Sequence, residues 1–304
     1  MAKVFTIIVT YNGSRWIEKC LAHLYNSSMA TNVVIVDNNS TDDTTKIIEE
    51  QFSGQSFMLF KTARNFGFGG GNNIGIEYAL KAGADYIFLL NQDAYVEPGC
   101  IGKLVETLEK HKDYGILSPL QLDSSGEQPD PAFKKYMLAS VAEEEIKKII
   151  ATRNCGIIPV RFVNAAAWMI PVPALRKTGV FHPAFAHYGE DNHYCSRMQY
   201  HGYKTGIDCE AAVIHDRGNE TKDEKKNLLR QLRTVPLYTL LDIRKNFFLA
   251  WLLGYKKLKR IKKKLGTALT EDEKLLYREQ KKWFRENLDR AKQIREETKK
   301  DAGI

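Results

Sequence analysis

Short apolar runs and helix-like segments alternate along the first hundred residues. The apolar runs predict four strands, at 4–10, 33–36, 57–60 and 86–90. Between the strands, apolar residues three or four positions apart predict helices that begin near Trp16, after Ser40 and near Asn73. Ser40, with Asp43 three residues on, is typical of a helix N-cap with an acidic first turn. The strands are continuously apolar, which indicates a mainly parallel sheet buried on both faces.

The second half of the chain is less regular and then becomes helical. Turn signals lie at 123–126 and 129–131, a strand-like apolar run at 161–172 and a polar cluster at 187–197. Beyond residue 222 the apolar residues recur with a helix-like period: Leu240, Leu241, Phe247, Phe248, Trp251, Leu252, Tyr255, Leu258, Ile261 and Leu265. The run 247–253 is shorter than the roughly 20 apolar residues that a membrane-spanning helix needs. We therefore predict an α/β domain over 1–220, a helical extension over 221–304, and no transmembrane helix.

The composition is that of a globular protein. Hydrophobic residues make up 43% of the 304 and charged residues 27%, which excludes a disordered or collagen-like chain. The apolar start leads to Tyr11-Asn12-Gly13 instead of a small-residue cleavage site, so it predicts a strand and not a signal peptide. The cysteines are odd in number, widely spaced and without a CxxC pair: Cys20, Cys100, Cys155, Cys195 and Cys209. We expect neither a disulfide framework nor a zinc site, and a location in the reducing cytoplasm.

The net charge of +8 is unevenly distributed along the chain. Residues 222–304 carry 24 Lys and Arg against 12 Asp and Glu, whereas residues 1–221 carry 21 against 25. The body is therefore not expected to bind nucleic acid. In the extension, 256–264 has seven basic residues in nine beside an apolar helix face. This pattern fits an anionic membrane surface, and equally a solvated helix whose apolar face packs on the body or forms a homo-oligomer.

Candidate chemistry lies where the predicted strands end. In open parallel sheets, ligands bind beyond the carboxyl ends of the strands, where Asp37, Asp93 and Tyr11-Asn12 fall together with the loop 64–73. A dinucleotide-binding fold would require GxGxxG after the first strand, and the sequence there is Tyr-Asn-Gly-Ser. A nucleotidyltransferase would need a basic glycine-rich loop at the same place. The pattern favours a mononucleotide site.

The motifs at these strand ends occur in a specific order and spacing. They are Val9-Thr10-Tyr11-Asn12, Val36-Asp37-Asn38-Asn39-Ser40-Thr41-Asp42, Asn65-Phe66-Gly67-Phe68-Gly69-Gly70-Gly71-Asn72-Asn73-Ile74-Gly75, Leu90-Asn91-Gln92-Asp93, Gly189-Glu190-Asp191 with Arg197, and His215. Together, from Val4 to about Gly218, they resemble glycosyltransferase family 2, the inverting enzymes of the GT-A fold. The glycine-rich segment with Asn-Gln-Asp is most similar to the rhamnosyltransferase and galactofuranosyltransferase branch. The resemblance implies a GT-A-like nucleotide-binding sandwich.

The resemblance implies a set of residues that hold the sugar nucleotide. Thr10, Tyr11 and Asp37 would contact the base and ribose. Gly67, Gly71 and Gly75 would permit close backbone approach. The remaining implied donor-site residues are Asn12, Asn39, Arg64, Asn65, Asn73, Asn91, Gln92 and Asp93.

The resemblance also implies a divalent cation, Mn²⁺ or Mg²⁺. Asn91-Gln92-Asp93 stands where the family has its DxD motif, with Asn91 in place of the first acid. Asp93 and His215 are the implied metal ligands, and the cation would neutralise the leaving diphosphate. A structural histidine and an ordinary strand-end turn are the alternatives for these positions.

Glu190 and Asp191 are the implied catalytic residues. Asp191 matches the family's general base, and Glu190 would orient the acceptor or Asp191. The sequence departs from many relatives at Phe181-His182-Pro183 and at His193, which bears on the acceptor contacts. Trp168 is expected to pack in the core, with sugar stacking as the alternative.

These features predict a metal-dependent inverting hexosyltransferase. It would transfer a sugar from a UDP- or dTDP-linked donor to a hydroxyl of a glycan or lipid-linked acceptor, in surface polysaccharide or cell-wall synthesis. The expected location is the cytoplasm, with peripheral attachment to the inner face of the membrane as an extension of that prediction. A non-catalytic membrane-binding or scaffold protein on a degenerate transferase fold, and a nucleotidyltransferase, are the alternatives.

Overall fold

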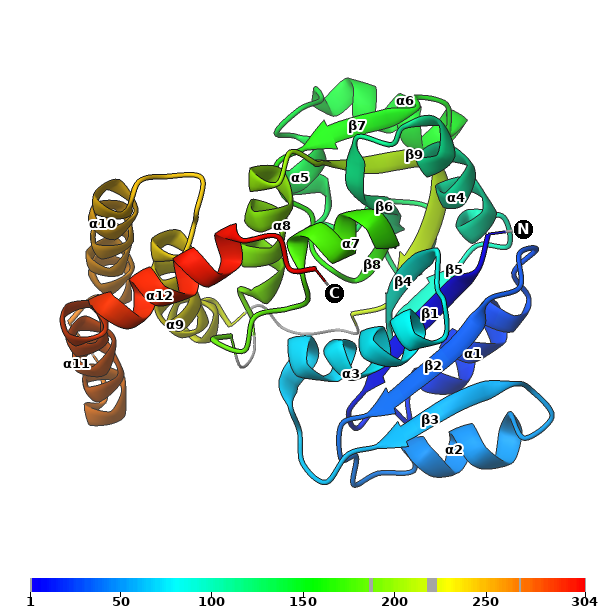
Figure 1. The fold of residues 1–304 in the computed structure, drawn as a ribbon, viewed down its shortest axis with the longest axis horizontal. Coiled ribbons are helices and arrows are strands. Elements are labelled where there is room, and N and C mark those ends of the chain that lie inside the picture. The colour runs from blue at the N-terminus through cyan, green and yellow to red at the C-terminus, as the bar shows by residue number, and fades with distance from the viewer. Residues whose placement is uncertain (1, 186–187, 218–222, 268, 304) are drawn as a thin grey trace.

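A computed structural model describes residues 2–185, 188–217, 223–267 and 269–303. A central sheet carries helices on its faces, and four helices of the extension lie to one side of it (Figure 1). In chain order the elements are β1(Val4–Thr10), α1(Ile17–Tyr25), β2(Asn32–Asp37), α2(Thr44–Gln51), β3(Phe57–Lys61), α3(Gly67–Lys81), β4(Tyr86–Asn91), β5(Ala94–Val96), α4(Cys100–Lys110), β6(Tyr114–Leu122), α5(Lys134–Met137), α6(Glu143–Thr152), β7(Ile157–Val160), β8(Ala167–Pro171), α7(Val172–Thr178), α8(Glu190–Tyr200), β9(Lys204–His215), α9(Glu224–Leu240), α10(Phe247–Leu265), α11(Glu271–Glu286) and α12(Leu288–Lys299).

The strand order brings six carboxyl ends to one edge of the sheet, those of β1, β2, β3, β4, β6 and β9. The order is β3-β2-β1-β4-β8-β6-β9-β5, with β7 on β9. The pairs from β3 to β4 are parallel, whereas β8 is antiparallel to both β4 and β6. Two reversals restore the direction, so β6 and its parallel partner β9 end at the same edge as β1, β2 and β4. The α/β fold with a sheet of mainly parallel strands is confirmed.

The glycine-rich segment is helical, and this corrects the prediction of a loop followed by a helix near Asn73. Helix α3 begins at Gly67, which has a positive φ of 74°. A Cβ on Gly71 would lie 2.7 Å from Val9 Cγ1, and one on Gly75 would lie 2.5 Å from Ile7 Cγ2. These glycines therefore let α3 lie directly on β1, and only Gly67 is required by backbone conformation.

The predicted N-cap at Ser40 is wrong. Helix α2 begins at Thr44, and its first turn is bonded by Asp42, whose Oδ1 accepts from Thr44 N at 3.1 Å. Ser40 Oγ accepts instead from Asn12 N at 2.9 Å. The hydroxyl thus joins the turns that follow β1 and β2, which is a tertiary contact that the local pattern does not encode.

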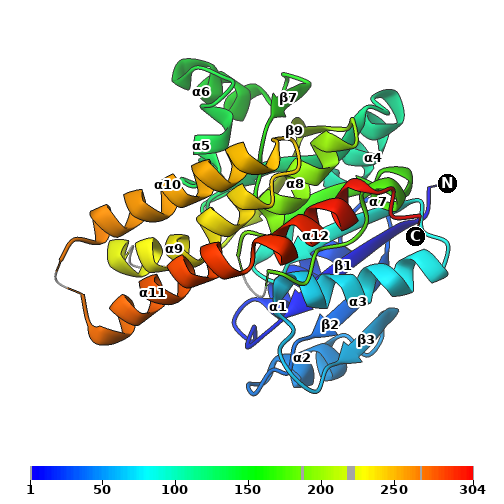
Figure 2. The ribbon, with the colours of Figure 1, turned by 60° about the vertical axis from the view of Figure 1, so that its left-hand side comes forward.

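The extension is a bundle of α9, α10, α11 and α12, and its helices lie side by side in Figure 2. The loop after Leu240 splits the predicted apolar run into α9 and α10. The buried residues of α10 are Ala250, Gly254, Leu258 and Ile261, and they pack within the bundle. Most of the apolar face that could have met a membrane is therefore covered, although Phe248 and Leu249 stay exposed. No helix in the described part of the chain is long and apolar enough to cross a membrane.

The end of the chain returns to the α/β body. His201 Nε2 lies 3.3 Å from the carbonyl oxygen of Thr298, and Ala302 N donates to Lys177 O at 3.2 Å. Phe185 packs among buried residues of the bundle, including Leu240 and Phe284. The two parts thus share an apolar interface. The predicted boundary between residues 220 and 221, and the predicted end of the resemblance at Gly218, lie outside the described residues.

One pair of cysteines is bonded, although the spacing of the cysteines led us to expect no disulfide framework. Cys155 and Cys209 are bonded, with their Cα atoms 5.7 Å apart and a sequence separation of 54. The antiparallel pairing of β7 with β9 brings the residues together, since Cys209 N also donates to Gly156 O. Cys20, Cys100 and Cys195 are free and buried.

Candidate active site

Polar groups surround Asp37 at the ends of β1 and β2. Its carboxylate is buried and accepts from Thr10 Oγ1 at 3.0 Å and from Ser40 N at 3.0 Å. Asn39 is exposed in the left-handed region with φ 68°. A fixed carboxylate at this edge, with a lone pair left on each oxygen, can accept hydrogen bonds from a nucleoside.

The turn after β1 is held to the end of β4. Gln92 Oε1 accepts from Tyr11 N at 3.0 Å, and a Cβ on Gly13 would lie 2.1 Å from that same oxygen. Asn12 has a φ of 46°, and its Oδ1 accepts from Thr41 N at 2.8 Å. The Tyr11 ring remains 47% exposed, so it is free to stack on a ligand.

Several of the predicted donor-site amides are bonded within the protein. Asn65 Oδ1 accepts from Gly67 N at 2.7 Å, at the start of α3. Asn73 donates to Phe181 O at 2.8 Å and accepts from Phe181 N at 3.0 Å. Asn73 therefore fixes the segment that leads to Glu190. Arg64 is exposed and lies over the Phe66 ring at 4.7 Å.

Asn38 is a residue of this region that the sequence reasoning overlooked. It is buried, its Oδ1 accepts from Phe66 N at 3.1 Å, and its Nδ2 donates to Gly67 O at 2.9 Å. It thus binds the end of β2 to the start of α3. Its place between Asp37 and Asn39 is a signal only within the whole motif, because asparagine is common in turns.

Asp93 and His215 lie together at the same edge. Antiparallel pairing sets Ala94 opposite His215, and His215 Nε2 lies 3.5 Å from Asp93 Oδ1. His215 is buried, and its Nδ1 has no hydrogen-bond partner among the described residues. A carboxylate oxygen and an imidazole nitrogen at this separation fit two neighbouring ligands of Mn²⁺ or Mg²⁺. No group of three or more potential metal ligands occurs among the residues with described positions, so other ligands would have to come from substrate or water.

Glu190 and Asp191 form the first turn of α8. Glu190 is buried, and its Oε2 has no partner in the described part of the chain. Burial, followed by the neighbouring Asp191 carboxylate, raises the pKa of Glu190 to about 7. Burial also raises the pKa of Asp191, against hydrogen bonds from Asn192 N and Nδ2 to its Oδ1 at 2.7 and 3.1 Å. Two adjacent carboxyl groups with raised pKa values are candidates for proton transfer, and the pKa of about 7 places the titration of Glu190 near neutral pH.

The two carboxyl groups face different neighbours. A Cβ on Gly69 would lie 3.8 Å from Glu190 Cβ, so Glu190 borders the first turn of α3. Asp191 adds its charge to the causes that raise the pKa of Tyr136 on α5 and Tyr238 on α9, after burial in both cases. Asp191 therefore lies between the body and the extension. Tyr136 was not recognised in the sequence, because the 121–160 segment carries no regular pattern.

The residues that depart from the family pattern are structural here. His193 is buried, and burial holds its pKa well below the usual value, so the ring is neutral. His182 Nδ1 accepts from Ala184 N at 3.1 Å. Trp168 is fully buried and stacks on Phe181, as expected for core packing.

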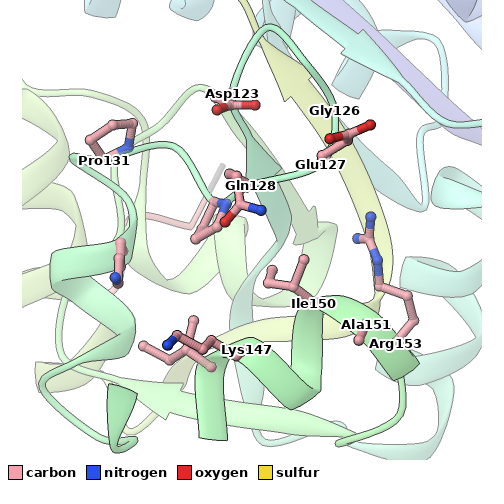
Figure 3. Close-up of a pocket in the computed structure, with 12 residues that line it drawn as sticks. Asp123, Gly126, Glu127, Gln128, Pro131, Lys147, Ile150, Ala151 and Arg153 are labelled. Carbon is pink, nitrogen blue, oxygen red and sulfur yellow. The ribbon is translucent and has the colours of Figure 1, made fainter. Parts of the chain in front are cut away.

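A hollow of about 760 Å³ lies beyond the end of β6, at the same edge of the sheet (Figure 3). The turn after β6 supplies Asp123 and Glu127 to one side, and α6 with the residue after it supplies Lys147 and Arg153 to the other. Asp130 closes the turn, accepting from Phe133 N and from Arg217 Nε at 2.8 Å each. Part of the 121–153 segment, which looked irregular in sequence, thus lines a hollow at the edge where β6 ends.

Comparison with known proteins places the chain in a family. The model described as Glycosyl transferase family 2 matches residues 6–179. The low-salt glycan biosynthesis hexosyltransferase Agl10 of Haloferax volcanii is 24% identical over 216 residues, which is 69% of this chain and 66% of that protein. The O-antigen chain rhamnosyltransferase WbaN of Salmonella anatum is 28% identical over 224 residues, covering 72% and 68% of the two chains. The chain thus aligns with about two thirds of each relative.

Solved structures share the fold at low sequence identity. The S. aureus TarS 1–349 complex with UDP-GlcNAc superposes with a TM-score of 0.62 at 14% identity, covering 99% of this chain and 90% of that one. The mannosyltransferase PcManGT from Pyrobaculum calidifontis, in complex with GDP-Man and Mn²⁺, gives a TM-score of 0.58 at 15% identity, with 97% and 84% covered. With the family match over more than half of its residues, the chain belongs to glycosyltransferase family 2 and has the GT-A fold.

Proposed function

We propose that this glycosyltransferase is a metal-dependent inverting enzyme that moves a hexosyl group from a UDP- or dTDP-linked donor to a hydroxyl of a glycan or lipid-linked acceptor. The observation that carries the proposal is the convergence of Asp37, Asp93 and His215 on the strand-end edge. The catalytic pair Glu190-Asp191 lies beside the glycine helix at that edge. Surface polysaccharide or cell-wall synthesis is the proposed setting, because two relatives are named for glycan and O-antigen synthesis.

The nucleoside would bind over the ends of β1 and β2. Asp37 is fixed by Thr10 and Ser40, and is therefore oriented before the ligand arrives. The exposed Tyr11 ring and Asn39 would close on the base and ribose. Preorganised acceptors of this kind reduce the ordering cost of binding.

Asp93 and His215 would hold a divalent cation beside the diphosphate. The cation supplies Lewis-acid stabilisation of the negative charge that develops on the leaving group. Asn91 gives this site a neutral neighbour in place of a second acid. The protein therefore contributes little negative charge to the metal site, and we expect the affinity for the metal to depend on the bound diphosphate.

Asp191 would act as the general base. The acceptor oxygen forms a bond to the anomeric carbon as the bond from that carbon to the diphosphate oxygen breaks, and the hydroxyl proton passes to the Asp191 carboxylate. A single displacement inverts the anomeric centre. Glu190, which lies on the side of α3, would raise the basicity of Asp191 through its own charge.

The extension would contribute to the acceptor side of the site. Phe248 and Leu249 are exposed in the first turn of α10, and these residues would touch an anionic membrane that carries a lipid-linked acceptor, with the basic residues from Lys256 onward further along the same helix. Most of the remaining apolar face of α10 is covered within the bundle, so such contact would be peripheral. A homo-oligomer would use the same exposed residues.

Release of nucleoside diphosphate from a panel of nucleotide sugars, measured from pH 5 to 9, tests the function and the role of Glu190. We expect turnover to rise with an apparent midpoint near pH 7, because ionisation of Glu190 makes the neighbouring Asp191 more basic. The same pKa shift affects the stability of the fold in the opposite direction. A carboxyl whose pKa is raised on folding stabilises the protein at low pH, and that contribution is lost as the pH rises from about 4.5 through 7.

Glu190→Gln is the matched variant for this measurement. Glutamine resembles the protonated side chain of Glu190. In this variant, turnover should therefore rise with pH well below pH 7, and the maximal rate should fall. Identical pH profiles for the wild type and Glu190→Gln would contradict the role of Glu190. Absence of turnover with every nucleotide sugar would favour the non-catalytic alternative.

A further inference from the structure

A second cavity lies between the body and the extension, on the other side of α8 from the core. It encloses about 530 Å³, which is within the range of small-ligand sites. Asn192 and Ser196 of α8 form one wall, and Tyr238 of α9 forms another. Residues from the segment after β7 and from α10 complete it. Of these residues, the sequence analysis singled out only Lys257, as a member of the basic segment 256–264.

The cavity is rich in positive charge. Four cations line it: Arg161, Arg244, Lys245 and Lys257. Among the described residues of the lining, Asp242 is the one carboxylate, so the cations are in excess there. Burial and the nearby Lys245 lower the pKa of Lys257, as expected for cations gathered without enough counter-charge. Such a site favours a ligand with more than one negative charge.

The loop between α9 and α10 holds two of these cations in place. Burial would raise the pKa of Asp242, but hydrogen bonds from Arg244 and Lys245 keep it at about 2. Arg244 Nε and Nη2 lie 2.8 and 2.9 Å from the two oxygens of Asp242. Arg295, which is buried, donates to Leu240 O at 2.7 Å and to Asp242 O at 2.8 Å. The arrangement is fixed by the protein before a ligand binds.

The cavity reaches the proposed base. Asn192 lines it, and the Asn192 Nδ2 donates to Asp191 Oδ1 at 3.1 Å. Tyr238 lines it as well, and Asp191 is among the charges that raise the pKa of that phenol, after burial. A ligand in the cavity would therefore lie beside the hydroxyl that Asp191 deprotonates.

An apolar strip on α10 leads into the cavity. Leu249, Leu253 and Lys257 are four residues apart, so they lie on one face of the helix. Leu249 is 40% exposed, whereas Leu253 and Lys257 line the cavity. The neighbouring Phe248 is 69% exposed. An amphiphile with an anionic head and an apolar chain matches this order of residues.

We propose that this cavity binds the diphosphate of a lipid-linked acceptor, and that the lipid chain extends out of the cavity over Leu249 and Phe248. The inference rests on the proposed transferase function and names its acceptor class. Four cations around one buried carboxylate would neutralise the diphosphate. The first sugar of the acceptor would then extend past Asn192 towards Asp191.

Binding of inorganic pyrophosphate and of farnesyl diphosphate, measured by calorimetry in EDTA, tests the cavity without the metal-dependent donor site. Lys257→Met keeps the length of the side chain and removes its charge, and Arg161→Gln removes a second cation. Lys256→Met is the matched control, because Lys256 is the preceding lysine of α10 and does not line the cavity. We expect at least a fivefold loss of affinity in Lys257→Met and in Arg161→Gln, and none in Lys256→Met. Farnesyl diphosphate should bind the wild type more tightly than pyrophosphate.

The source of the phosphate is distinguished by dihexanoylphosphatidylglycerol and inorganic phosphate in the same assay. Both should bind more weakly than farnesyl diphosphate and with less dependence on Lys257. Equal affinity of the wild type and Lys257→Met for farnesyl diphosphate would overturn the proposal, as would stronger Lys257-dependent binding of the phospholipid. Hydrolysis of the nucleotide-sugar donor, measured in parallel, reports separately on the transferase function. If it persists in a protein that binds no diphosphate here, only the acceptor inference fails.

Discussion

Asp191→Asn should lower turnover by about a hundredfold or more, in line with the usual contribution of a general base. The change keeps the size of the side chain and its position next to Asn192, but an amide does not accept the acceptor proton at neutral pH. Donor affinity should stay within about twofold, because the side chain keeps its size and Asp191 is not among the residues proposed to hold the donor. Steady-state kinetics with a saturating donor measure the first effect, and donor titration measures the second.

Glu190→Gln is the control that separates the members of the pair. It should retain more activity than Asp191→Asn, because Glu190 acts on the basicity of its neighbour. An inactive Glu190→Gln together with a nearly wild-type Asp191→Asn would assign the base to Glu190. Both proteins should unfold at similar temperatures, which excludes loss of the fold as the cause.

Asp93→Ala should abolish the stabilisation that a nucleotide sugar gives in the presence of Mn²⁺. A ligand at a hundred times its dissociation constant adds about 2.7 kcal/mol to the free energy of unfolding, which corresponds to a rise in Tm of about 5 °C for a chain of this size. The variant removes a metal ligand and leaves the backbone pairing of β5 with β9 intact. Thermal unfolding of the wild type and the variant, with donor and with either Mn²⁺ or EDTA, measures the effect.

His215→Gln tests the second proposed metal ligand by the same measurement of thermal unfolding. It should reduce the shift by less than Asp93→Ala does, because the carboxylate carries the charge that attracts the cation. Equal shifts in Mn²⁺ and in EDTA for the wild type would remove Asp93 and His215 from the metal assignment.

The first half of the fold could be predicted from local pattern. The strand 4–10 coincides with β1, and the other three predicted strands agree within one residue at each end, because buried parallel strands are unbroken apolar runs. The positions of Asp37 and Asp93 could also be predicted, because Asp37 ends one of these strands and Asp93 comes shortly after another. The helical state of 67–72 did not follow, because the glycines there serve a contact with β1 that no local propensity expresses.

The second half depended on contacts between distant segments. The Cys155–Cys209 pair requires β7 to lie antiparallel to β9, and nothing in the spacing of the cysteines indicates that pairing. The apolar period of α10 was visible in the sequence, but the same period serves a membrane or a neighbouring helix. In the structure, most of that face of α10 packs against α9 and α11, so the apolar period there serves helix packing. The basic cavity beside Asn192 needed four segments to come together.

The anomeric configuration of the product tests the central claim most directly. The enzyme would be incubated with Mn²⁺, a nucleotide sugar that it turns over and an acceptor, and the new linkage would be followed by proton NMR from the first turnovers. We expect a product with the configuration opposite to that of the donor, formed together with one nucleoside diphosphate per sugar and lost in Asp191→Asn. A product that retains the donor's configuration would contradict the single displacement assisted by Asp191.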